Sequence, residues 1–468
     1  MHMPRAQRPQ VLDLIAQLAP GQPLPAAALA ERLGVDRMAL SRLVAASGPQ
    51  VVRMGRTRAT AYALRRPTRA GSEWPLYRLR EDATLEELGR VIALVGGGFH
   101  VDAGPDCPNL RRAPEGGVAA FFPDLPWYLD DLRPQGFLGR SFAHGRGQAL
   151  GLPKDLNGWQ PDDVLMALVT AGGTEAGDLL LGIAAVEAAM ETLQAPIDRV
   201  AADDRLAQYR ERARAALDGE DVGSSPGGEQ PKFTATVEVH GRRRSVLVKF
   251  AQPDEGAAAQ RWSDLLVCEH LALEALRQSG QAAASSELLQ SPTHTFLEIE
   301  RFDRTPDLLG RRGLVSLLSL SSAFTGEVTP AWPVAGAELR DQGWLTADTV
   351  QAMGRRHAFG RLIGNSDMHH GNIAFHFVDR GPLPLAPVYD MLPMSLAPSK
   401  LGVLRADEPL SPVAPLGSGD LQHLRWAAPV AEAFWQCVAV DGRIQSPAMR
   451  SLAGANAERV REMGARFG

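Results

Sequence analysis

The sequence contains no apolar run close to the roughly 20 residues that cross a bilayer, and its first residues, MHMPRAQRPQ, lack the apolar core of a signal peptide. Its three cysteines, Cys107, Cys268 and Cys437, are too widely spaced for a disulfide framework or a zinc site. Internal repeats and low-complexity tracts are also absent. These absences exclude a membrane-spanning or disulfide-rich protein, and we expect a cytoplasmic protein with reduced thiols and no membrane partner.

The composition is ordinary for a globular protein, with 45% hydrophobic and 22% charged residues, and the length suffices for about two to four domains. The net charge of −5 is unevenly distributed. Residues 1–69 hold eleven arginines against three carboxylates, a net charge of +8, which leaves −13 for the rest of the chain. A basic segment joined to an acidic body indicates a nucleic-acid-binding module attached to another function.

The pattern in residues 1–67 predicts a winged helix-turn-helix domain. Helices are expected over 10–18, 26–33 and 37–46, and strands over 51–53 and 59–64, joined by the basic segment MGRTR. The side chains expected to face duplex DNA lie on the third helix and on the wing: Arg37, Ser41, Arg42, Arg53, Arg56 and Arg58. A small domain used for protein contacts is the alternative, because a fold alone does not fix a function.

The stretch 362–375, LIGNSDMHHGNIAF, places a polar cluster between two apolar flanks. Asp367 and Asn372 lie five residues apart, after a predicted helix and before a predicted strand. In phosphoryl transfer, such an aspartate positions or deprotonates the attacking hydroxyl group, and such an asparagine holds magnesium on the nucleotide phosphates. Asp390, in the later segment PVYDM, is placed to be a second magnesium ligand. Ordinary polar loops also contain Asp-x4-Asn pairs, so the pair indicates phosphoryl transfer only if the rest of the chain supplies the other residues of such a site.

A lysine and a glutamate supply further parts. The loop 223–232, GSSPGGEQPK, can present backbone amides to an anion or serve as an inert linker. A hairpin of strands 233–240 and 245–250 follows, in which Lys249 lies on the face opposite Val248. Glu269 falls on the apolar stripe of a helix predicted over 260–276, where a carboxylate needs a partner. We predict the ion pair Lys249–Glu269, with an unrelated arginine as the alternative partner of Glu269.

The remaining segments complete a two-lobed pattern. ERFDR, residues 300–304, follows a short predicted strand, where a kinase joins its two lobes and lays the adenine against the backbone. Helices are expected over 314–322, 345–363 and 420–438. The region 68–222 is less informative and includes a helix predicted over 86–94.

Five motifs, GSSPGGEQPKF, SVLVKF, ERFDR, GNSDMHHGN and PVYDM, occur in the order of the HipA-type serine/threonine kinases, the toxins of bacterial toxin–antitoxin modules. The chain resembles this family from about residue 75 onwards. The resemblance implies Asp367, Lys249 and Glu269 as the catalytic set, and Asn372 and Asp390 as magnesium ligands. The ATP-binding residues that it implies are Ser225, Gly227, Gly228, Gln230, Lys232, Lys249, Glu300, Phe302 and His369. Ser225, or Ser224 beside it, matches the serine that these kinases autophosphorylate.

The expected fold class is α+β: a winged helix-turn-helix followed by a bilobal kinase-like domain with an α/β N-lobe and an all-helical C-lobe. The expected domains are 1–67, 68–222, 223–310 and 311–468. The resemblance implies a kinase that uses ATP and Mg2+ to phosphorylate a protein, with translation components as candidate substrates. Its expected partners are ATP, a protein substrate, duplex DNA and an antitoxin. The fused N-terminal segment resembles a single-chain subgroup, and it could restrain the kinase, repress a promoter or dock an antitoxin.

Three other functions compete with this one. Small-molecule phosphotransferases of the aminoglycoside and choline kinase type use a similar Asp-x4-Asn loop. Asp367, His369 and His370 could instead ligate a transition metal in a nuclease. The chain could also be a DNA-binding repressor whose second half binds ATP without turnover. The presence of all four residues Lys249, Asp367, Asn372 and Asp390 argues against that, because an inactive kinase usually lacks one of them.

Overall fold

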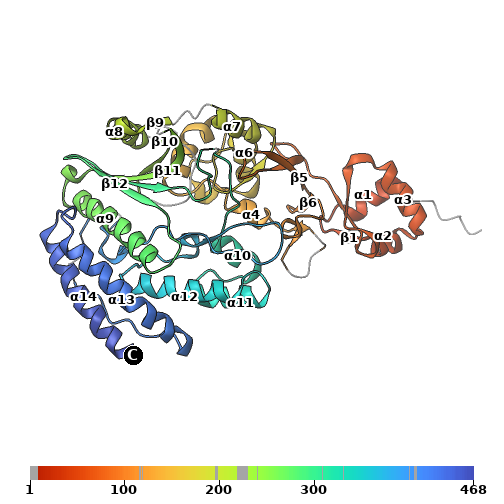
Figure 1. Ribbon diagram of the computed structural model, residues 1–468. Coiled ribbons are helices and arrows are strands. Elements are labelled where there is room, and N and C mark those ends of the chain that lie inside the picture. The colour runs from red at the N-terminus through yellow and green to blue at the C-terminus, as the bar shows by residue number, and fades with distance from the viewer. Residues whose placement is uncertain are drawn as a thin grey trace, which may run out of the picture.

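The computed structural model describes residues 9–114, 118, 120–194, 199–218, 230–239, 241–307, 309–329, 331–399, 401–404 and 408–467. Figure 1 shows a small N-terminal unit at one side, a central body with two large sheets, and the long helices α13 (Ser418–Val440) and α14 (Pro447–Phe467) at the other end. None of the described helices is long and apolar enough to span a membrane.

The N-terminal unit consists of three helices and a small antiparallel sheet. The helices are α1 (Val11–Leu18), α2 (Ala26–Leu33) and α3 (Arg37–Ala46), as the sequence predicted. The strands are β1 (Leu24–Pro25), β2 (Val51–Met54) and β3 (Ala61–Leu64), in the order β1-β3-β2. Asp36 caps α3, because its carboxylate accepts a hydrogen bond of 2.7 Å from the Ala39 amide. Leu14, Leu29 and Leu40 form the core between the helices.

The middle region is built on a five-stranded antiparallel sheet, in the order β7-β6-β5-β4-β8. Its strands are β4 (Glu73–Leu79), β5 (Leu85–Ala93), β6 (Phe99–Ala103), β7 (Phe121–Phe122) and β8 (Leu179–Leu181). Its helices are α4 (Trp127–Asp130), α5 (Gly136–Phe142), α6 (Pro161–Ala171) and α7 (Ile183–Gln194). The helix predicted over 86–94 is wrong. Pairing of β5 with β4 and β6 outweighs the local helical preference of Glu86 and Glu87.

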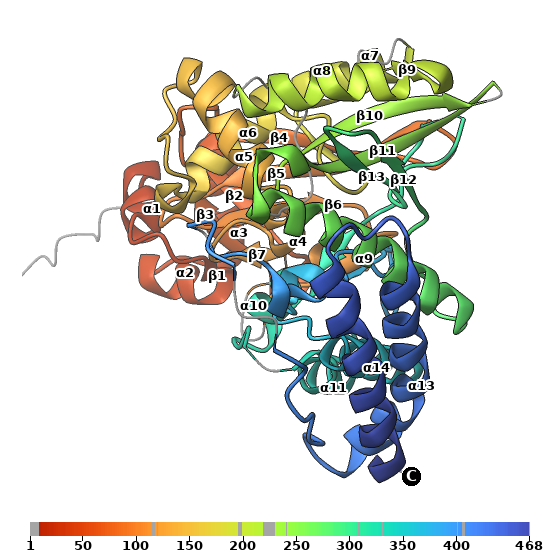
Figure 2. The ribbon, with the colours of Figure 1, turned by 90° about the vertical axis from the view of Figure 1, so that its left-hand side faces the viewer.

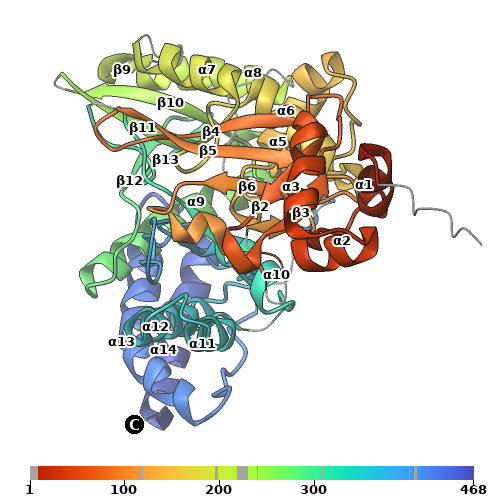
Figure 3. The same ribbon diagram turned by 90° about the vertical axis from the view of Figure 1, so that its right-hand side faces the viewer.

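The N-terminal unit is packed firmly against the middle sheet (Figure 3). Val52 and Met54 of β2 share a buried cluster with Ile92 and Leu94. The backbones also touch, since a Cβ atom on Gly21 would lie 2.6 Å from the Gly96 Cα atom. Both faces of the small N-terminal sheet are therefore covered, one by helices and the other by the middle region.

A third sheet has the order β12-β13-β11-β10-β9. Its strands are β9 (Arg199–Ala201), β10 (Lys232–Val239), β11 (Arg242–Ala251), β12 (Ser286–Gln290) and β13 (Thr295–Glu300). Helices α8 (Arg205–Leu217) and α9 (Ala257–Gln278) lie on its two sides (Figure 2). Tyr209 of α8 packs on Phe233, and Leu266 of α9 packs on Leu297 of the opposite face. This is the α/β lobe that the sequence predicted, with β9 and α8 added to it.

The C-terminal half is mainly helical. Its helices before α13 are α10 (Leu317–Phe324), α11 (Trp332–Asp341) and α12 (Ala347–Leu362). The prediction that this half is all-helical is wrong, because β14 (Val315–Ser316) pairs with β15 (Ala374–Phe375). Because residues 315 and 316 are paired as a strand, α10 begins at Leu317 and not at residue 314 as predicted. Ser316 caps the helix by accepting a hydrogen bond from the Ser319 amide.

Candidate functional site

The predicted ion pair between Lys249 and Glu269 is present. The Lys249 ammonium on β11 lies 2.7 and 2.8 Å from the two carboxylate oxygens of Glu269 on α9. It also lies 2.6 Å from Oδ1 of Asp390. Lys249 is 3% exposed and Glu269 is fully buried, so this ion pair lies out of contact with water, whereas Asp390 is partly exposed.

The three groups alter one another's protonation. Burial would favour neutral Lys249, but Asp390 and Glu269 outweigh it and raise the pKa of the ammonium. Burial also opposes the ionisation of Asp390, yet Lys249 and Lys232 hold the pKa of this carboxyl below its usual value. Burial raises the pKa of Glu269, partly offset by Lys249. The single ammonium is thus shared by two carboxylates, and Asp390 is the more firmly ionised of the two.

Lys232 adds a second cation. It stands directly opposite Lys249 in the register of β10 and β11, and it is 2% exposed. Burial, reinforced by Lys249, lowers the pKa of Lys232 to about 8. The residues that the structure describes offer its ammonium no hydrogen-bond or ion-pair partner. A buried cation without a partner is costly, and an anionic ligand would relieve that cost.

These groups form one end of a pocket of about 620 Å³, including its mouth. Its lining residues are Ala176, Lys232, Leu247, Lys249, Ile299, Glu300, Arg301, Phe302, Asp303, Leu314, Tyr389 and Asp390. Glu300 and Phe302, predicted to lie beside adenine, are on the wall. The Phe302 and Tyr389 rings lie 5.8 Å apart. The pocket therefore has an apolar, aromatic part and a charged part.

The loop after α12 carries Asp367 and Asn372. The helix ends in a left-handed glycine, Gly364 at φ +73°, and the Asn365 amide donates to the Gly360 carbonyl at 2.8 Å. The Asn365 side chain then accepts a hydrogen bond from the Asp367 amide at 3.0 Å. Asn372 donates from its side chain to the Asp367 carbonyl at 2.8 Å. The two predicted residues are held in one compact loop.

The same loop lines a second, open cavity. Asp367 and His369 lie on its wall, together with Thr329, Ala331, His357, Arg361, Asn365, Ser366, Met368 and Leu416. His369 also contributes to lowering the pKa of Asp390, after the larger effects of burial and the two lysines, so it lies near both cavities. His370, by contrast, is 1% exposed. Asp367 thus faces an open, solvent-accessible space.

Some predicted positions lie outside the described residues. These are Ser224, Ser225, Gly227 and Gly228 of the predicted phosphate loop. Gln230, at the end of that loop, is described and is partly buried. All six residues predicted to face DNA are exposed, on α3, on β2 and after it: Arg37, Ser41, Arg42, Arg53, Arg56 and Arg58.

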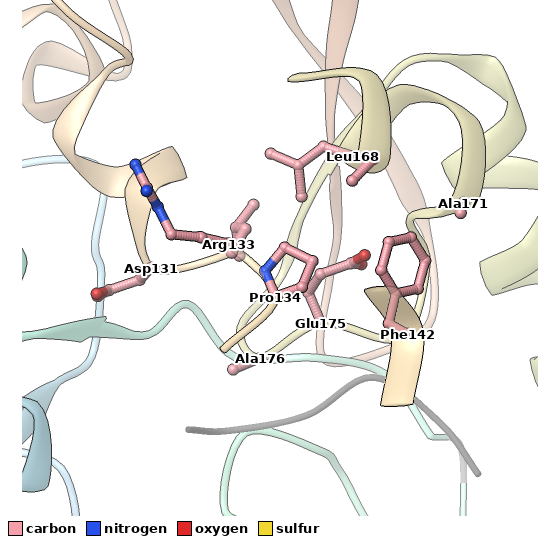
Figure 4. Close-up of a pocket in the computed structure, with 10 residues that line it drawn as sticks. Asp131, Arg133, Pro134, Phe142, Leu168, Ala171, Glu175 and Ala176 are labelled. Atoms are coloured by element: carbon pink, nitrogen blue, oxygen red, sulfur yellow. The ribbon is translucent and has the colours of Figure 1, made fainter. Parts of the chain in front are cut away.

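Sequence reasoning missed the structural role of ERFDR. Asp303 is 4% exposed and accepts hydrogen bonds from Arg301 at 2.8 Å and Arg304 at 2.7 Å. Both arginines donate to backbone carbonyls of residues 174–177 in the middle region. The side chain of Glu175 lies near Pro134 and Phe142 (Figure 4). Four charged residues among the five of ERFDR were the available signal that this segment joins two regions as well as lining the pocket.

Family models match most of the chain after the N-terminal unit. The model of the YjjJ-like toxin middle domain matches residues 70–190, and that of the HipA-like C-terminal domain matches residues 224–435. The chain is 39% identical over 455 residues to Toxin YjjJ of Escherichia coli (strain K12), which covers 97% of this chain and 98% of that protein.

Solved structures with similar chains include the toxin–antitoxin complex of HipA, HipB and operator DNA from Shewanella oneidensis MR-1, at 14% identity and a TM-score of 0.49 over 83% of this chain and 99% of that chain. The proinflammatory kinase CtkA of Helicobacter pylori matches at 12% identity and a TM-score of 0.36, over 50% of this chain and 94% of that chain. Because the similarity to Toxin YjjJ extends over nearly the whole of both proteins, and the HipA-like model spans Lys249, Asp367 and Asp390, the chain belongs to the HipA-type toxin family.

Proposed function

We propose that this protein is an ATP-dependent serine/threonine protein kinase. The observation that carries the proposal is the buried pair Lys249–Glu269, joined by the partly exposed Asp390, at the charged end of a pocket whose other end is apolar and aromatic. A lysine on a strand paired with a glutamate on a helix, and close to an aspartate, is the arrangement that kinases use to hold nucleotide phosphates. The apolar wall with Phe302 suits the adenine ring.

The residues present fit ATP and magnesium. The buried Lys232 ammonium faces the same pocket without an ion-pair partner among the described residues, so a phosphate group would supply a counter-charge. Asp390 and Asn372 are the oxygen donors for Mg2+, which usually takes one or two protein ligands besides phosphates and water. When bound, magnesium would neutralise part of the phosphate charge. Lys249 would then exchange its contact with Asp390 for one with phosphate.

Asp367 is the proposed positioning group for the acceptor hydroxyl. It lies on the wall of the open cavity, so its carboxylate can accept a hydrogen bond from a serine or threonine brought in by a protein. The hydrogen bonds of Asn365 and Asn372 to its backbone fix the loop that presents it. Autophosphorylation of Ser225 or Ser224 stays a prediction, as does a cytoplasmic location.

Phosphate transfer from labelled ATP by the purified intact chain tests the proposal. Asp367→Gln should lower the rate a hundredfold or more, since a positioned base contributes on the order of 3–5 kcal/mol. Asp341→Gln is the matched control, because Asp341 is exposed and pairs only with Arg340 beside it. Unchanged transfer in Asp367→Gln would contradict the assignment. Label appearing in an aminoglycoside or choline and never in protein would instead favour the small-molecule phosphotransferase.

A nuclease is a weaker candidate. In the part of the chain that the structure describes, there is no group of three or more His, Cys, Asp or Glu side chains that could hold a metal ion. His370, one of the three residues considered for that role, is buried.

We also propose that the N-terminal unit is a winged helix-turn-helix that binds duplex DNA. The support is the arrangement of three helices with a β2–β3 hairpin, and the five exposed arginines on α3 and the hairpin. The proposed domains remain 1–67, 68–222, 223–310 and 311–468, with one refinement. Because β9 pairs with β10 and α8 packs on the third sheet, the boundary near 222 is better placed before β9.

A further inference from the structure

A separate polar cavity lies on the third sheet next to the nucleotide pocket. Its volume is about 380 Å³ including the space at its mouth, and its wall consists of Gly173, Thr174, Thr192, Thr234, Ala235, Thr236, Ser245, Val246, Arg301, Arg304 and Arg311. Thr234 and Thr236 lie on the same face of β10 as Lys232, because side chains two residues apart share a face. Arg301 is the one residue that lines both cavities. We call this second space the arginine cavity.

The three arginines of the arginine cavity are between 4% and 8% exposed. Arg301 and Arg304 both bond to Asp303, and Arg311 donates from Nη2 to the Gly173 carbonyl. The other terminal nitrogen of Arg311, Nη1, is buried and has no hydrogen-bond partner among the described residues. A buried charged donor without an acceptor is rare and costly. This nitrogen therefore needs an acceptor that the described residues do not provide.

Carboxylates surround the arginines, but only Asp303 among those described bonds directly to any of the three. Glu175 and Asp178 act on Arg311 through space, and among the described residues neither accepts a hydrogen bond from it. The side chain of Glu175 lies in the neighbouring space near Pro134 and Phe142 and accepts a hydrogen bond from the Gly173 amide (Figure 4). Burial lowers the pKa of Arg311 to about 10, so its guanidinium is still charged at neutral pH. The missing acceptor should therefore be an anion.

The hydroxyl groups restrict which anion fits. Thr234, Thr236 and Ser245 add oxygen atoms to the wall, and hydroxyl groups can donate to several oxygens of one compact ligand. Guanidinium groups match the oxygen spacing of phosphate. A carboxylate offers only two oxygens, whereas a tetrahedral oxyanion offers four to donors on different sides.

We propose that the arginine cavity is a binding site for a phosphate-type oxyanion, distinct from the nucleotide pocket. The bound anion would accept a charge-assisted hydrogen bond from Nη1 of Arg311. Because Arg301 and Arg304 tie residues 174–177 to ERFDR, the anion would also stiffen the connection between the middle region and the wall of the nucleotide pocket. The proposal does not depend on kinase activity.

The thermal unfolding midpoint of the intact chain is measured with increasing inorganic phosphate. Chloride at the same ionic strength serves as the reference. Phosphate should raise the thermal midpoint, because a ligand that binds only the folded state stabilises it. The shift should persist in saturating magnesium and a non-hydrolysable ATP analogue. It should disappear in Arg311→Gln and require severalfold more phosphate in Thr236→Val. Arg312→Gln is the matched control, because Arg312 is partly exposed and its ion pair is with Glu81 at the surface.

Three results would overturn the proposal. Loss of the shift when the ATP analogue is present would mean that phosphate binds beside Lys232 and Lys249. An equal shift in Arg311→Gln would mean adventitious binding elsewhere, and no shift in the wild type would mean that water satisfies the nitrogen. If Arg311→Gln does not fold, Thr236→Val and Arg311→Lys should still weaken phosphate binding. Asp367→Gln should bind phosphate like the wild type, so failure of the kinase proposal would be recognised separately.

Discussion

Four side chains around the proposed nucleotide pocket, the buried Lys232, Lys249 and Glu269 and the partly exposed Asp390, sum to zero charge when all are ionised. Each carries a full charge in a region from which water is largely excluded. Breaking such a group by removing one member costs more than the group contributes when complete, because it leaves a charge uncompensated. Stability and ligand binding are therefore coupled at these residues.

A double-variant experiment tests the central pair. Lys249→Ala should destabilise the protein by about 3–5 kcal/mol, because it leaves Glu269 and Asp390 without their shared cation. Adding Glu269→Gln should restore part of that loss. Urea unfolding of the two single variants and the double variant measures the coupling. Strict additivity of the two changes would show that the pair contributes no coupling energy.

The sequence was sufficient to predict this pair and to assign Lys232 and Asp390 to the same site, but not to predict how these two residues contact the pair. Glu269 lies on an apolar helix face, and a charge there demands a partner. Lys249 lies on the strand face opposite a run of apolar residues. The contact of Lys232 with the same pocket depends on the register of β10 against β11, and that of Asp390 depends on a contact across 141 positions. Neither of these contacts produces a recognisable pattern in the neighbouring sequence.

At the scale of elements, one carboxylate joins the middle region to the C-terminal half. Asp131, just after α4, accepts hydrogen bonds from the amide and hydroxyl of Ser316, the residue that caps α10. Burial raises the pKa of Asp131 to about 6, although the bonds from Ser316 oppose the rise. Ser316, which caps α10 in the C-terminal half, is thus held in place by the ionisable side chain of Asp131 in the middle region.

The pH dependence of stability should report this group. A carboxyl group with a raised pKa holds its proton more tightly in the folded state, so its contribution to stability is present at low pH and falls from about pH 4 to pH 6. Relative to Asp131→Asn, the wild type should lose on the order of 1–2 kcal/mol over that range. Urea midpoints at pH 4, 5, 6 and 7 give the difference. Parallel curves for the two proteins would contradict the assignment.

Elements with strong periodicity or clear end signals were predictable, and those defined by distant pairing were not. α2 and α3 occupy the predicted residues, because Gly34 ends α2 and Asp36 begins α3. β5 was mistaken for a helix, since its acidic start is helix-like and its partner strands lie elsewhere in the chain. β1 is two residues long and exists only by pairing with β3.

At the scale of the whole molecule, the N-terminal unit cannot be treated as a free module. One face of its sheet is buried against β5, so an isolated fragment of residues 1–67 would expose Val52 and Met54. The contact between Gly21 and Gly96 leaves no room for a side chain on either residue. DNA binding is therefore best measured on the intact chain.

Affinity for duplex DNA should fall steeply with salt, by about 0.9 logarithmic units per phosphate contact for each tenfold rise in salt. Arg56→Ala should weaken binding to all sequences alike and reduce this slope, because the residue is placed to contact the backbone. Arg42→Ala, on α3, should relax the sequence preference in a selection from random duplexes. Binding that is absent or insensitive to salt would instead favour a protein-docking role for the unit.

The scarcity of lysine gives the pocket a distinctive reactivity. Of 49 basic residues in the sequence, only Lys154, Lys232, Lys249 and Lys400 are lysines. With its pKa lowered to about 8, Lys232 holds much of its amine in the neutral, nucleophilic form at pH 8.5, whereas Lys249 stays protonated. A small acylating reagent should therefore modify Lys232 in preference to Lys249, and ATP should protect it, while exposed Lys154 reacts regardless. Peptide mass mapping would measure the three yields, and equal labelling of Lys232 and Lys249 would contradict the expectation. The pocket would then offer a covalent anchoring point for inhibitors inside the nucleotide site itself.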